Sequence, residues 1–270
     1  MELRMPVRIE RRGHVGLILL DEPQTHHALS RSLIAGVLEA LAHEDIVKAR
    51  AIVISSTGPS FCAGANISDL LDGWMSTPDA SDDPVLMFRA LAQDPRPTIA
   101  AVDGAALGGG FELMLSCDLA VASTRSWFAL PELAHGVIPN TALMRLQQMI
   151  GLRGLYQLMM TGERVSAERA LSLGLVSNLC DNGRAVDTAV QMASEIVERV
   201  SPGALALAKR TAMQYASTDW QRVQQSLLEA PRREWQEGLT AFTQKRSPDY
   251  SEFWDKPCED RESGAGGSKD

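Results

Sequence analysis

Two short turns built from small residues carry the first chemical signal in this sequence. Phe61-Cys-Ala-Gly-Ala-Asn66 and Gly108-Gly-Gly-Phe-Glu112 each follow an apolar run typical of a strand and lead into an expected helix. Small residues expose their backbone amides, and helix N-termini add positive potential. If both turns lie at the carboxyl ends of neighbouring parallel strands, their N–H groups can point into one crevice and stabilise an oxyanion. Alternatively, both turns are rich in glycine only because the chain reverses tightly there.

Two glutamates near these turns are candidates for acid-base chemistry. Glu112 stands in the apolar stretch Phe111-Glu-Leu-Met-Leu115, and Glu132 follows Leu130-Pro131. Buried carboxylates are costly unless they are paired or functional. In one cleft, desolvation and mutual repulsion would leave one protonated donor and one ionised base near neutral pH. Alternatively, Glu112 is a first-turn residue favoured by the helix dipole, and Glu132 is a surface residue at a helix start.

Other familiar site motifs are missing from the sequence. Gly104-Ala-Ala-Leu-Gly-Gly-Gly110 is neither a dinucleotide-binding fingerprint nor a phosphate-binding loop with its lysine. The chain has no G-x-S-x-G elbow and no H-E-x-x-H, and Glu132-Leu-Ala-His135 is a single E-x-x-H. We therefore expect no metal site and no nucleotide cofactor. His135 could hydrogen-bond a substrate, but we expect a packed or capping histidine.

The elements that must hold these residues alternate between strands and helices. Val15–Leu20, Ala51–Ser55, Thr98–Val102 and Asp118–Ala122 are apolar runs typical of buried strands. Helical periodicity follows the expected N-cap Ser30, between the first two runs. The alternation predicts an α/β fold with parallel strands.

From residue 140 onward the pattern is mostly helical. Leu175-Val-Ser177 is the one short apolar piece that predicts an edge strand in this part. The expected helices cover residues 84–93 in the first half, and 141–150, 152–160, 166–173, 185–200, 202–216 and 218–245 in the second.

Composition excludes several classes of protein. The 270 residues include 26 basic and 34 acidic side chains, giving a net charge of −8 and a pI near 5.2, which disfavours nucleic-acid binding. No apolar run reaches the length of about 18 residues that spans a membrane, and no secretory signal is visible. The four cysteines are far apart, which fits reduced thiols. We therefore expect a cytoplasmic protein that binds neither nucleic acid nor membrane.

Further motifs accompany the two turns in a fixed order. They are Leu20-Asp-Glu-Pro-Gln-Thr-His-His-Ala-Leu-Ser30, Ala101-Val-Asp-Gly104, Cys117-Asp118, Leu130-Pro-Glu132, Thr161-Gly162, Ala170–Val176, Glu237-Gly238 and Ala241-Phe-Thr-Gln-Lys-Arg246. Together they resemble the crotonase, or enoyl-CoA hydratase/isomerase, superfamily from about Val7 to Asp249. The resemblance implies a spiral of ββα turns over residues 1–200 and a helical oligomerisation region over residues 201–257. A disordered tail is expected over residues 258–270.

The resemblance also implies roles for individual residues. The amides of Ala63 and Gly109 would form the oxyanion hole for a thioester carbonyl, Glu112 would activate water, and Glu132 would donate a proton to Cα. Coenzyme A would enter only as part of the acyl thioester substrate, with no other cofactor. Substrate or coenzyme A contacts are expected from His27, Ala28, Ala65, Ile67, Asn140, Phe242 and Lys245.

The resemblance further implies assembly as a homo-trimer or hexamer. Hydrophobic C-terminal residues favour the same self-association, namely Trp220, Leu227, Leu228 and Trp235. Residues around the acidic loop 72–84 could line an acyl pocket, although such residues more often form plain core: Trp74, Met75, Met87 and Phe88.

Departures from the family pattern leave several functions open. Glu22 and Thr25 stand where the family carries basic residues near coenzyme A phosphates, His27 replaces a usual Asn, and Asn66 a usual Asp. Asn140 replaces the acidic base of dienoyl-CoA isomerases. Hydration of a 2-enoyl-CoA is the leading hypothesis. One alternative is an isomerase, dehydratase or decarboxylase that acts on coenzyme A or carrier-protein thioesters. Another is a catalytically degenerate scaffold that binds acyl-CoA.

Overall fold

The computed structural model describes residues 6–74, 79–215, 221 and 232–250. Several residues singled out above lie outside this part of the chain: Met75, Trp220, Leu227, Leu228, Cys258 and the tail 258–270. Within the described residues, none of the helices is long and apolar enough to cross a membrane.

The main sheet is built from the apolar runs of the first half of the chain. Its order is β1-β2-β3-β4-β6-β9; β1 pairs antiparallel with β2, and the other neighbours are parallel. The strands span Val7–Arg12 (β1), Val15–Leu20 (β2), Ala51–Ser56 (β3), Thr98–Val102 (β4), Leu119–Ser123 (β6) and Asn178–Cys180 (β9). Because β2 to β4 are buried on both faces, they consist of nearly continuous apolar residues.

A second, smaller sheet holds the segments that follow the main strands. It contains β5 (Ala105–Leu107), β7 (Trp127–Ala129) and β8 (Val165–Ser166), in that order. Single bridges extend it, because Cys62 pairs with Ala106 and Leu29 pairs with Ala65. Each turn of the chain thus contributes one piece to the main sheet and one to the small sheet, which is the expected repeating ββα arrangement.

The helices cover the main sheet from both faces. One face packs against α8 through Ala185, Ala189 and Ala193, and the other belongs to the larger core. The helices are η1 (Pro23–Thr25), α1 (Arg31–Ala42), α2 (Glu44–Val47), α3 (Ile67–Leu71), α4 (Pro84–Gln93), α5 (Gly109–Leu115), η3 (Glu132–His135), α6 (Asn140–Thr161), α7 (Ala167–Ser172), α8 (Ala185–Arg199), α9 (Pro202–Tyr215) and α11 (Arg232–Thr243). As expected, the Ser30 side chain caps α1 by accepting from the Leu33 amide.

Two elements in the second half of the chain differ from the expected ones. The helices expected at 141–150 and 152–160 form one element, α6, in which Gly151 has non-helical angles (φ 69°). The edge strand expected at Leu175–Ser177 was wrong by three residues, since β9 begins at Asn178. The Leu175 amide donates to the Ala170 carbonyl oxygen of α7, so Leu175 still belongs to the C-terminal end of that helix and not to a strand.

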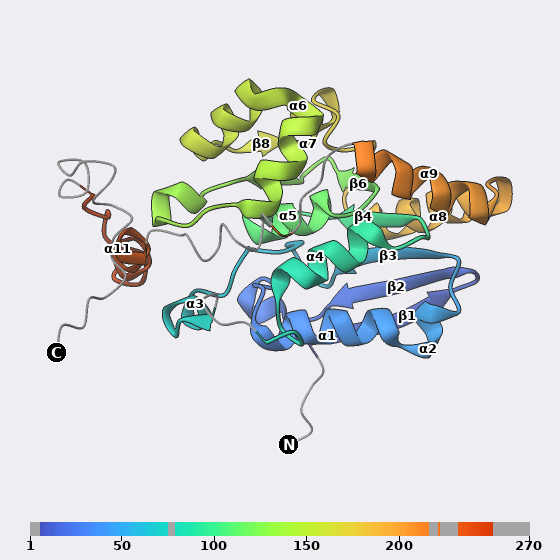
Figure 1. Ribbon diagram of the computed structural model, residues 1–270, viewed down its shortest axis with the longest axis horizontal. Coiled ribbons are helices and arrows are strands. Elements are labelled where there is room, and N and C mark those ends of the chain that lie inside the picture. The colour runs from blue at the N-terminus through green and yellow to red at the C-terminus, as the bar shows by residue number, and fades with distance from the viewer. Residues whose placement is uncertain (1–5, 75–78, 216–220, 222–231, 251–270) are drawn as a thin grey trace, which may run out of the picture.

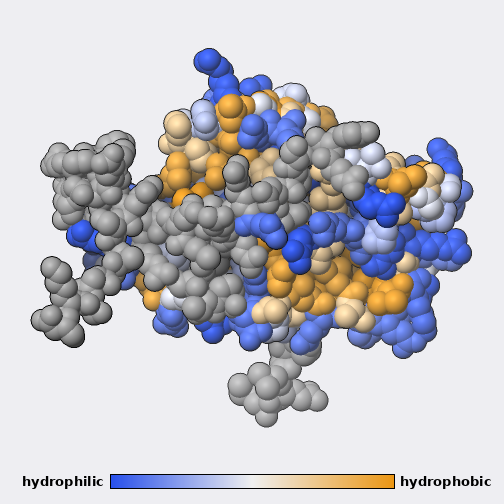
Figure 2. Space-filling view, in the orientation of Figure 1, coloured by the Kyte–Doolittle hydropathy of each residue, from blue (hydrophilic) through white to orange (hydrophobic). Residues whose placement is uncertain are grey.

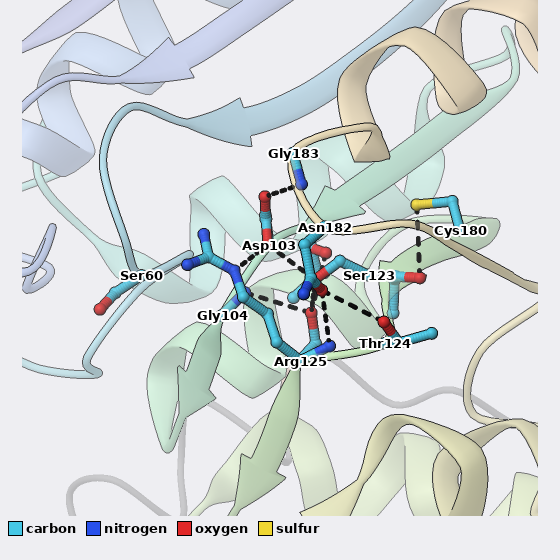
Figure 3. A network of polar contacts seen from close by, with 12 residues as sticks. Ser60, Asp103, Gly104, Ser123, Thr124, Arg125, Cys180, Asn182 and Gly183 are labelled. Atoms are coloured by element: carbon cyan, nitrogen blue, oxygen red, sulfur yellow. Dashed lines mark hydrogen bonds and ion pairs between the residues drawn. The ribbon is translucent and has the colours of Figure 1, made fainter.

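Asp103 ties together the carboxyl ends of three strands (Figure 3). It follows β4 and accepts hydrogen bonds from the Ser123 hydroxyl at the end of β6 (2.6 Å) and from Arg125 (2.5 Å). Its other oxygen accepts from the Gly183 amide beyond β9 (2.8 Å). This network fixes the chain just before Gly104 and β5, which lead to the turn at residues 108–110.

The C-terminal helix α11 packs against η3, on the opposite side of the molecule from α8 and α9 (Figure 1). Two glycines make this contact close. A methyl group at Gly136 would lie 2.6 Å from the Glu234 backbone, and one at Gly238 would collide with the His135 carbonyl oxygen. Trp235 is only 8% exposed and belongs to this chain's own core, which corrects its expected role in self-association.

We predict that Gly238→Ala destabilises the protein, although alanine normally favours a helix. The new methyl group must push α11 away from η3, which should lower the free energy of unfolding by about 1–3 kcal/mol. Gly203→Ala in α9 is the matched control, because no atom lies within 4 Å of its added methyl group. Urea unfolding of both variants checks this; equal stability would contradict the close contact.

Candidate active site

The small sheet brings the two glycine-rich turns together. The amides of Phe61 and Cys62 donate to the Ala105 carbonyl oxygen (2.9 and 3.1 Å), and the Leu107 amide donates to Cys62 (2.9 Å). On the other side, the Leu29 amide donates to the Gly64 carbonyl oxygen (2.7 Å). The turn after β3 is therefore held between residue 29 and β5, directly beside the turn that opens α5.

Glycine is needed for this close approach as well as for exposing amides. Gly64 has φ 95°, and a methyl group there would lie 2.9 Å from the Leu107 carbonyl oxygen and 3.6 Å from the Gly109 nitrogen. A methyl group at Gly110 would collide with the Cys62 carbonyl oxygen. Close packing of the backbone is thus one reason for the small residues in both turns. Their expected role as oxyanion donors stays a prediction.

The two expected oxyanion donors differ in their surroundings. Gly109 is the first residue of α5, so its N–H has no partner within the helix. Ala63 is exposed, but its amide donates to the His26 carbonyl oxygen (3.0 Å). A substrate oxygen at Ala63 must therefore share or replace that bond. Sequence reasoning missed this carbonyl, because it belongs to the backbone.

The His26 carbonyl is held by a strained turn. His26 and His27 both have left-handed backbone angles, with φ 53° and 56°. Asn, Asp and His are the side chains that tolerate this region best after glycine. The two adjacent histidines were the available sequence signal for such a turn.

Glu112 is buried and partly stabilised as a carboxylate. Its Oε1 accepts from the amides of Thr141 (2.7 Å) and Ala142 (3.0 Å), in the first turn of α6. Burial raises its pKa to about 7, and the two N–H groups oppose that rise. The second oxygen, Oε2, lies 3.9 Å from where a methyl group on Gly109 would stand. Glu112 Oε2, which accepts no hydrogen bond from the described residues, therefore lies near the expected oxyanion donor.

Glu132 has the opposite surroundings. Both carboxyl oxygens are buried and have no hydrogen-bond partner in the described part of the chain. Burial, and next the charge of Glu112, raise its pKa well above the ordinary value. A methyl group at Gly108 would lie 2.8 Å from Oε1, so this glycine makes room for the carboxyl group. Of the two groups, Glu132 is the one favoured in its protonated form near neutral pH.

Both glutamates and both turns line one cavity of about 590 Å³. Among the described residues that line it, none is a lysine or an arginine. Its apolar wall comes from α3, the residue Trp74 that follows it, α4, the segment after η3, and α11: Ile67, Leu70, Trp74, Val85, Phe88, Val137, Ile138, Leu239 and Phe242. The cavity therefore suits an uncharged chain whose reacting end meets the two carboxyl groups.

Most of the expected contact residues line this cavity, and two do not. Ala28, Ala65, Ile67, Asn140 and Phe242 do so together with the four expected catalytic residues, Glu112, Glu132, Ala63 and Gly109. Lys245 is exposed beyond the end of α11 and does not line it. The roles of all these residues stay predictions.

The His27 ring is fully buried and makes hydrogen bonds to the backbone of the surrounding segments. Its Nδ1 accepts from the Glu22 amide (3.0 Å), so Nε2 carries the proton that it donates to the Thr57 carbonyl oxygen. The ring is thus placed to hold the backbone of residues 22–28, and it does not line the cavity. Asn66 is also occupied, because its Oδ1 caps α3 at Ser68 and Asp69.

The described residues contain no group of three or more side chains that could hold a metal ion.

Comparison with known proteins agrees with the fold. The sequence pattern of the enoyl-CoA hydratase/isomerase family matches residues 10–253. The mitochondrial enoyl-CoA hydratase of Pongo abelii is 33% identical, over 90% of this chain and 87% of that protein. The 2,3-dehydroadipyl-CoA hydratase of Escherichia coli K12 is 32% identical, over 90% and 97%. The crystal structure of a carnitinyl-CoA hydratase from Mycobacterium avium superposes with a TM-score of 0.78 at 30% identity, over 92% and 99% of the two chains. This chain is a member of the enoyl-CoA hydratase/isomerase family, in the crotonase superfamily.

Proposed function

We propose that this protein is an enoyl-CoA hydratase, which adds water to the α,β double bond of an acyl-CoA thioester or removes it in reverse. The observation that carries this proposal is the unequal pair of buried glutamates facing one cavity. Glu112 is hydrogen-bonded as a carboxylate, and Glu132 is buried without a partner among the described residues. Relatives named as enoyl-CoA hydratases support the same activity.

The proposed mechanism uses each of these groups once. The thioester carbonyl oxygen accepts from the amides of Gly109 and Ala63, after the latter releases the His26 carbonyl. Glu112 takes a proton from water while the water oxygen bonds to Cβ. The electron pair of the double bond moves toward the carbonyl oxygen, and the resulting enolate takes a proton from Glu132 at Cα. The amides act mainly on the charge that develops on the carbonyl oxygen, which is where such donors contribute most.

The isomerase, dehydratase and decarboxylase alternatives would use the same oxyanion donors. An acid and a base in one cavity favour hydration together with its reverse, dehydration, because both directions need a proton acceptor and a proton donor. The degenerate scaffold is disfavoured by the retention of all four expected catalytic residues, Glu112, Glu132, Ala63 and Gly109.

We also propose assembly as a homo-trimer or hexamer, as expected for this family. The second half of α6 exposes Leu152, Tyr156 and Met160, and Figure 2 shows hydrophobic surface in this region, at the top of the view. These side chains recur at four-residue intervals and so share one helix face.

We predict that Glu112→Gln and Glu132→Gln each lower kcat by roughly 10²–10⁴, because each removes a proton-transfer group and keeps the side-chain shape. The assay is loss of the conjugated thioester absorbance with crotonyl-CoA and a panel of longer, branched and aromatic 2-enoyl-CoAs. Glu39→Gln, at an exposed position of α1, is the control and should retain full activity. Near-normal rates in both variants would refute the mechanism.

A second prediction concerns stability and pH. Since the pKa of Glu112 is about 7 in the folded chain, the folded state binds more protons than the unfolded state between about pH 4.5 and 7. Its contribution to stability is therefore present at low pH and is lost as the pH rises through 7. The raised pKa corresponds to roughly 3 kcal/mol, so Glu112→Gln should gain stability relative to the wild type by up to this amount from pH 5 to pH 8. Denaturant unfolding across this range measures the difference, and a constant difference would argue against a buried, titrating Glu112.

A third prediction tests whether the acyl group of the substrate is bound to coenzyme A or to a carrier protein. Glu22, which stands where the family carries a basic residue, is half-buried, and its pKa is raised by burial and by the charge of Asp69. Glu22→Arg should lower KM for enoyl-CoA by up to about fivefold, the scale of one exposed charge pair, with kcat unchanged. Glu39→Arg serves as the charge-matched control. If the same acyl group turns over faster on a carrier protein and Glu22→Arg leaves KM unchanged, the carrier thioester is the substrate.

A further inference from the structure

The expected oxyanion donor Ala63 is occupied by the chain's own backbone. Its amide donates to the His26 carbonyl oxygen (3.0 Å), although Ala63 is exposed and lines the cavity. A thioester oxygen that accepts from this amide would lie beside the His26 oxygen, and both oxygens carry negative partial charge. Their repulsion grows as the thioester carbonyl becomes an enolate. Replacing the bond to His26 is therefore favoured over sharing it.

The His26 carbonyl belongs to a tight turn. The Ala28 amide donates to the Thr25 carbonyl oxygen (3.2 Å), which closes a four-residue turn around His26 and His27. Both central residues have left-handed φ angles, 53° and 56°, and His26 has ψ 35°. These angles are typical of a type I′ turn. Rotating the peptide group between the two histidines by about 180° converts this turn into type II′ and leaves its ends in place.

The turn is held on both sides of this peptide group. The His27 ring accepts from the Glu22 amide (3.0 Å), and the His27 carbonyl oxygen accepts from the Cys62 thiol (3.0 Å). The His26 ring forms a hydrogen bond of 3.2 Å with the Ser60 hydroxyl. Because the residues on either side are fixed in this way, the movement that frees Ala63 is confined to one peptide group.

Rotation of this peptide group replaces an acceptor by a donor. The His26 oxygen turns away from Ala63, and the His27 N–H takes its direction. In the structure this N–H donates to the Glu22 carbonyl oxygen (3.0 Å), which also accepts from the amide and the hydroxyl of Thr25 (3.2 and 3.1 Å). The Glu22 oxygen therefore keeps two donors after the rotation. Two N–H groups, of Ala63 and His27, would then need an acceptor, and a ligand oxygen supplies it.

We propose that the His26–His27 peptide group is a gate of the oxyanion hole. It rotates when a thioester binds, frees the Ala63 amide and adds the His27 N–H as a third donor beside Gly109. This inference rests on the proposed function, because it takes Ala63 and Gly109 to bind the thioester oxygen. His26 is then a positioning residue. The first central position of a type II′ turn favours glycine, so a histidine there keeps the gate closed while the cavity is empty.

The sequence allows this one peptide group to be observed directly. His27 is the only one of the five histidines that follows another histidine. In protein labelled with ¹³C and ¹⁵N in histidine alone, only the His27 nitrogen is bonded to a labelled carbonyl carbon, so an amide-to-carbonyl NMR correlation gives a single signal. Unreactive butanoyl-CoA should shift this signal in the amide and the carbonyl dimension, because both groups change partners. S-Butyl coenzyme A is the matched control; it lacks the carbonyl oxygen and should shift the signal much less.

Two variants test the cost of the rotation. His26→Gly and His26→Asn both remove the ring that contacts Ser60, but only glycine adopts the type II′ turn freely, whereas asparagine tolerates the left-handed closed form. His26→Gly should bind butanoyl-CoA at least about fivefold more tightly than His26→Asn, the scale of one strained residue. Both variants should bind S-butyl coenzyme A equally. Calorimetry gives the Kd values, and circular dichroism verifies that both variants are folded.

The wild-type NMR signal decides the inference even if a variant does not fold. A signal that butanoyl-CoA leaves unshifted, or that both ligands shift equally, would overturn the gate. Equal affinities of the two variants for butanoyl-CoA would overturn the role of His26. If the signal and the affinities change as expected, but no 2-enoyl-CoA is hydrated, the proposed reaction fails while the gate stands.

Discussion

The backbone of Gly108 to Gly110 lies between the turn at Cys62 and the carboxyl group of Glu132, and the rest of the site depends on this contact. Side chains at these glycines would collide with the Cys62 carbonyl oxygen or crowd the Glu132 carboxyl group. Because they are absent, the first amides of α5 reach the cavity and the acid lies beside them. The turn at Cys62, the start of α5 and the Glu132 carboxyl group are thus positioned by closely packed backbone. Such packing is more rigid than contacts between long side chains.

Burying both glutamates in this site has a cost in folding free energy. Two carboxyl groups are buried in one apolar cavity, and only Glu112 receives hydrogen bonds from the described residues. Replacing both by neutral residues of the same shape would remove desolvation and repulsion, so stability alone does not explain them. Their difference in hydrogen bonding gives two glutamates with the same intrinsic pKa different tendencies to hold a proton, as the proposed base and acid require.

Much of this arrangement could be predicted from the sequence, and the missing parts share a physical reason. The apolar runs of β2, β3 and β4, the N-cap at Ser30 and the interruption of the helix at Gly151 follow from local patterns, so they were predicted correctly. Strands β5, β7 and β8 have only two or three residues, too few for a periodic pattern. The amides of Thr141 and Ala142 and the carbonyl of His26 belong to the backbone, so residue type does not reveal them. The burial of the His27 ring likewise depends on Thr57, which is distant in sequence.

The hydrogen bond from the Gly183 amide to Asp103 joins residues 80 positions apart. Asp103 precedes the turn that presents Gly109, whereas Gly183 follows the last strand of the main sheet. During synthesis, Asp103 therefore leaves the ribosome well before Gly183, the residue whose amide anchors it. Contacts of such high sequence separation slow folding, because loop closure must come first. A nascent chain that ends before β9 contains all four residues expected to be catalytic but lacks this hydrogen bond to Asp103.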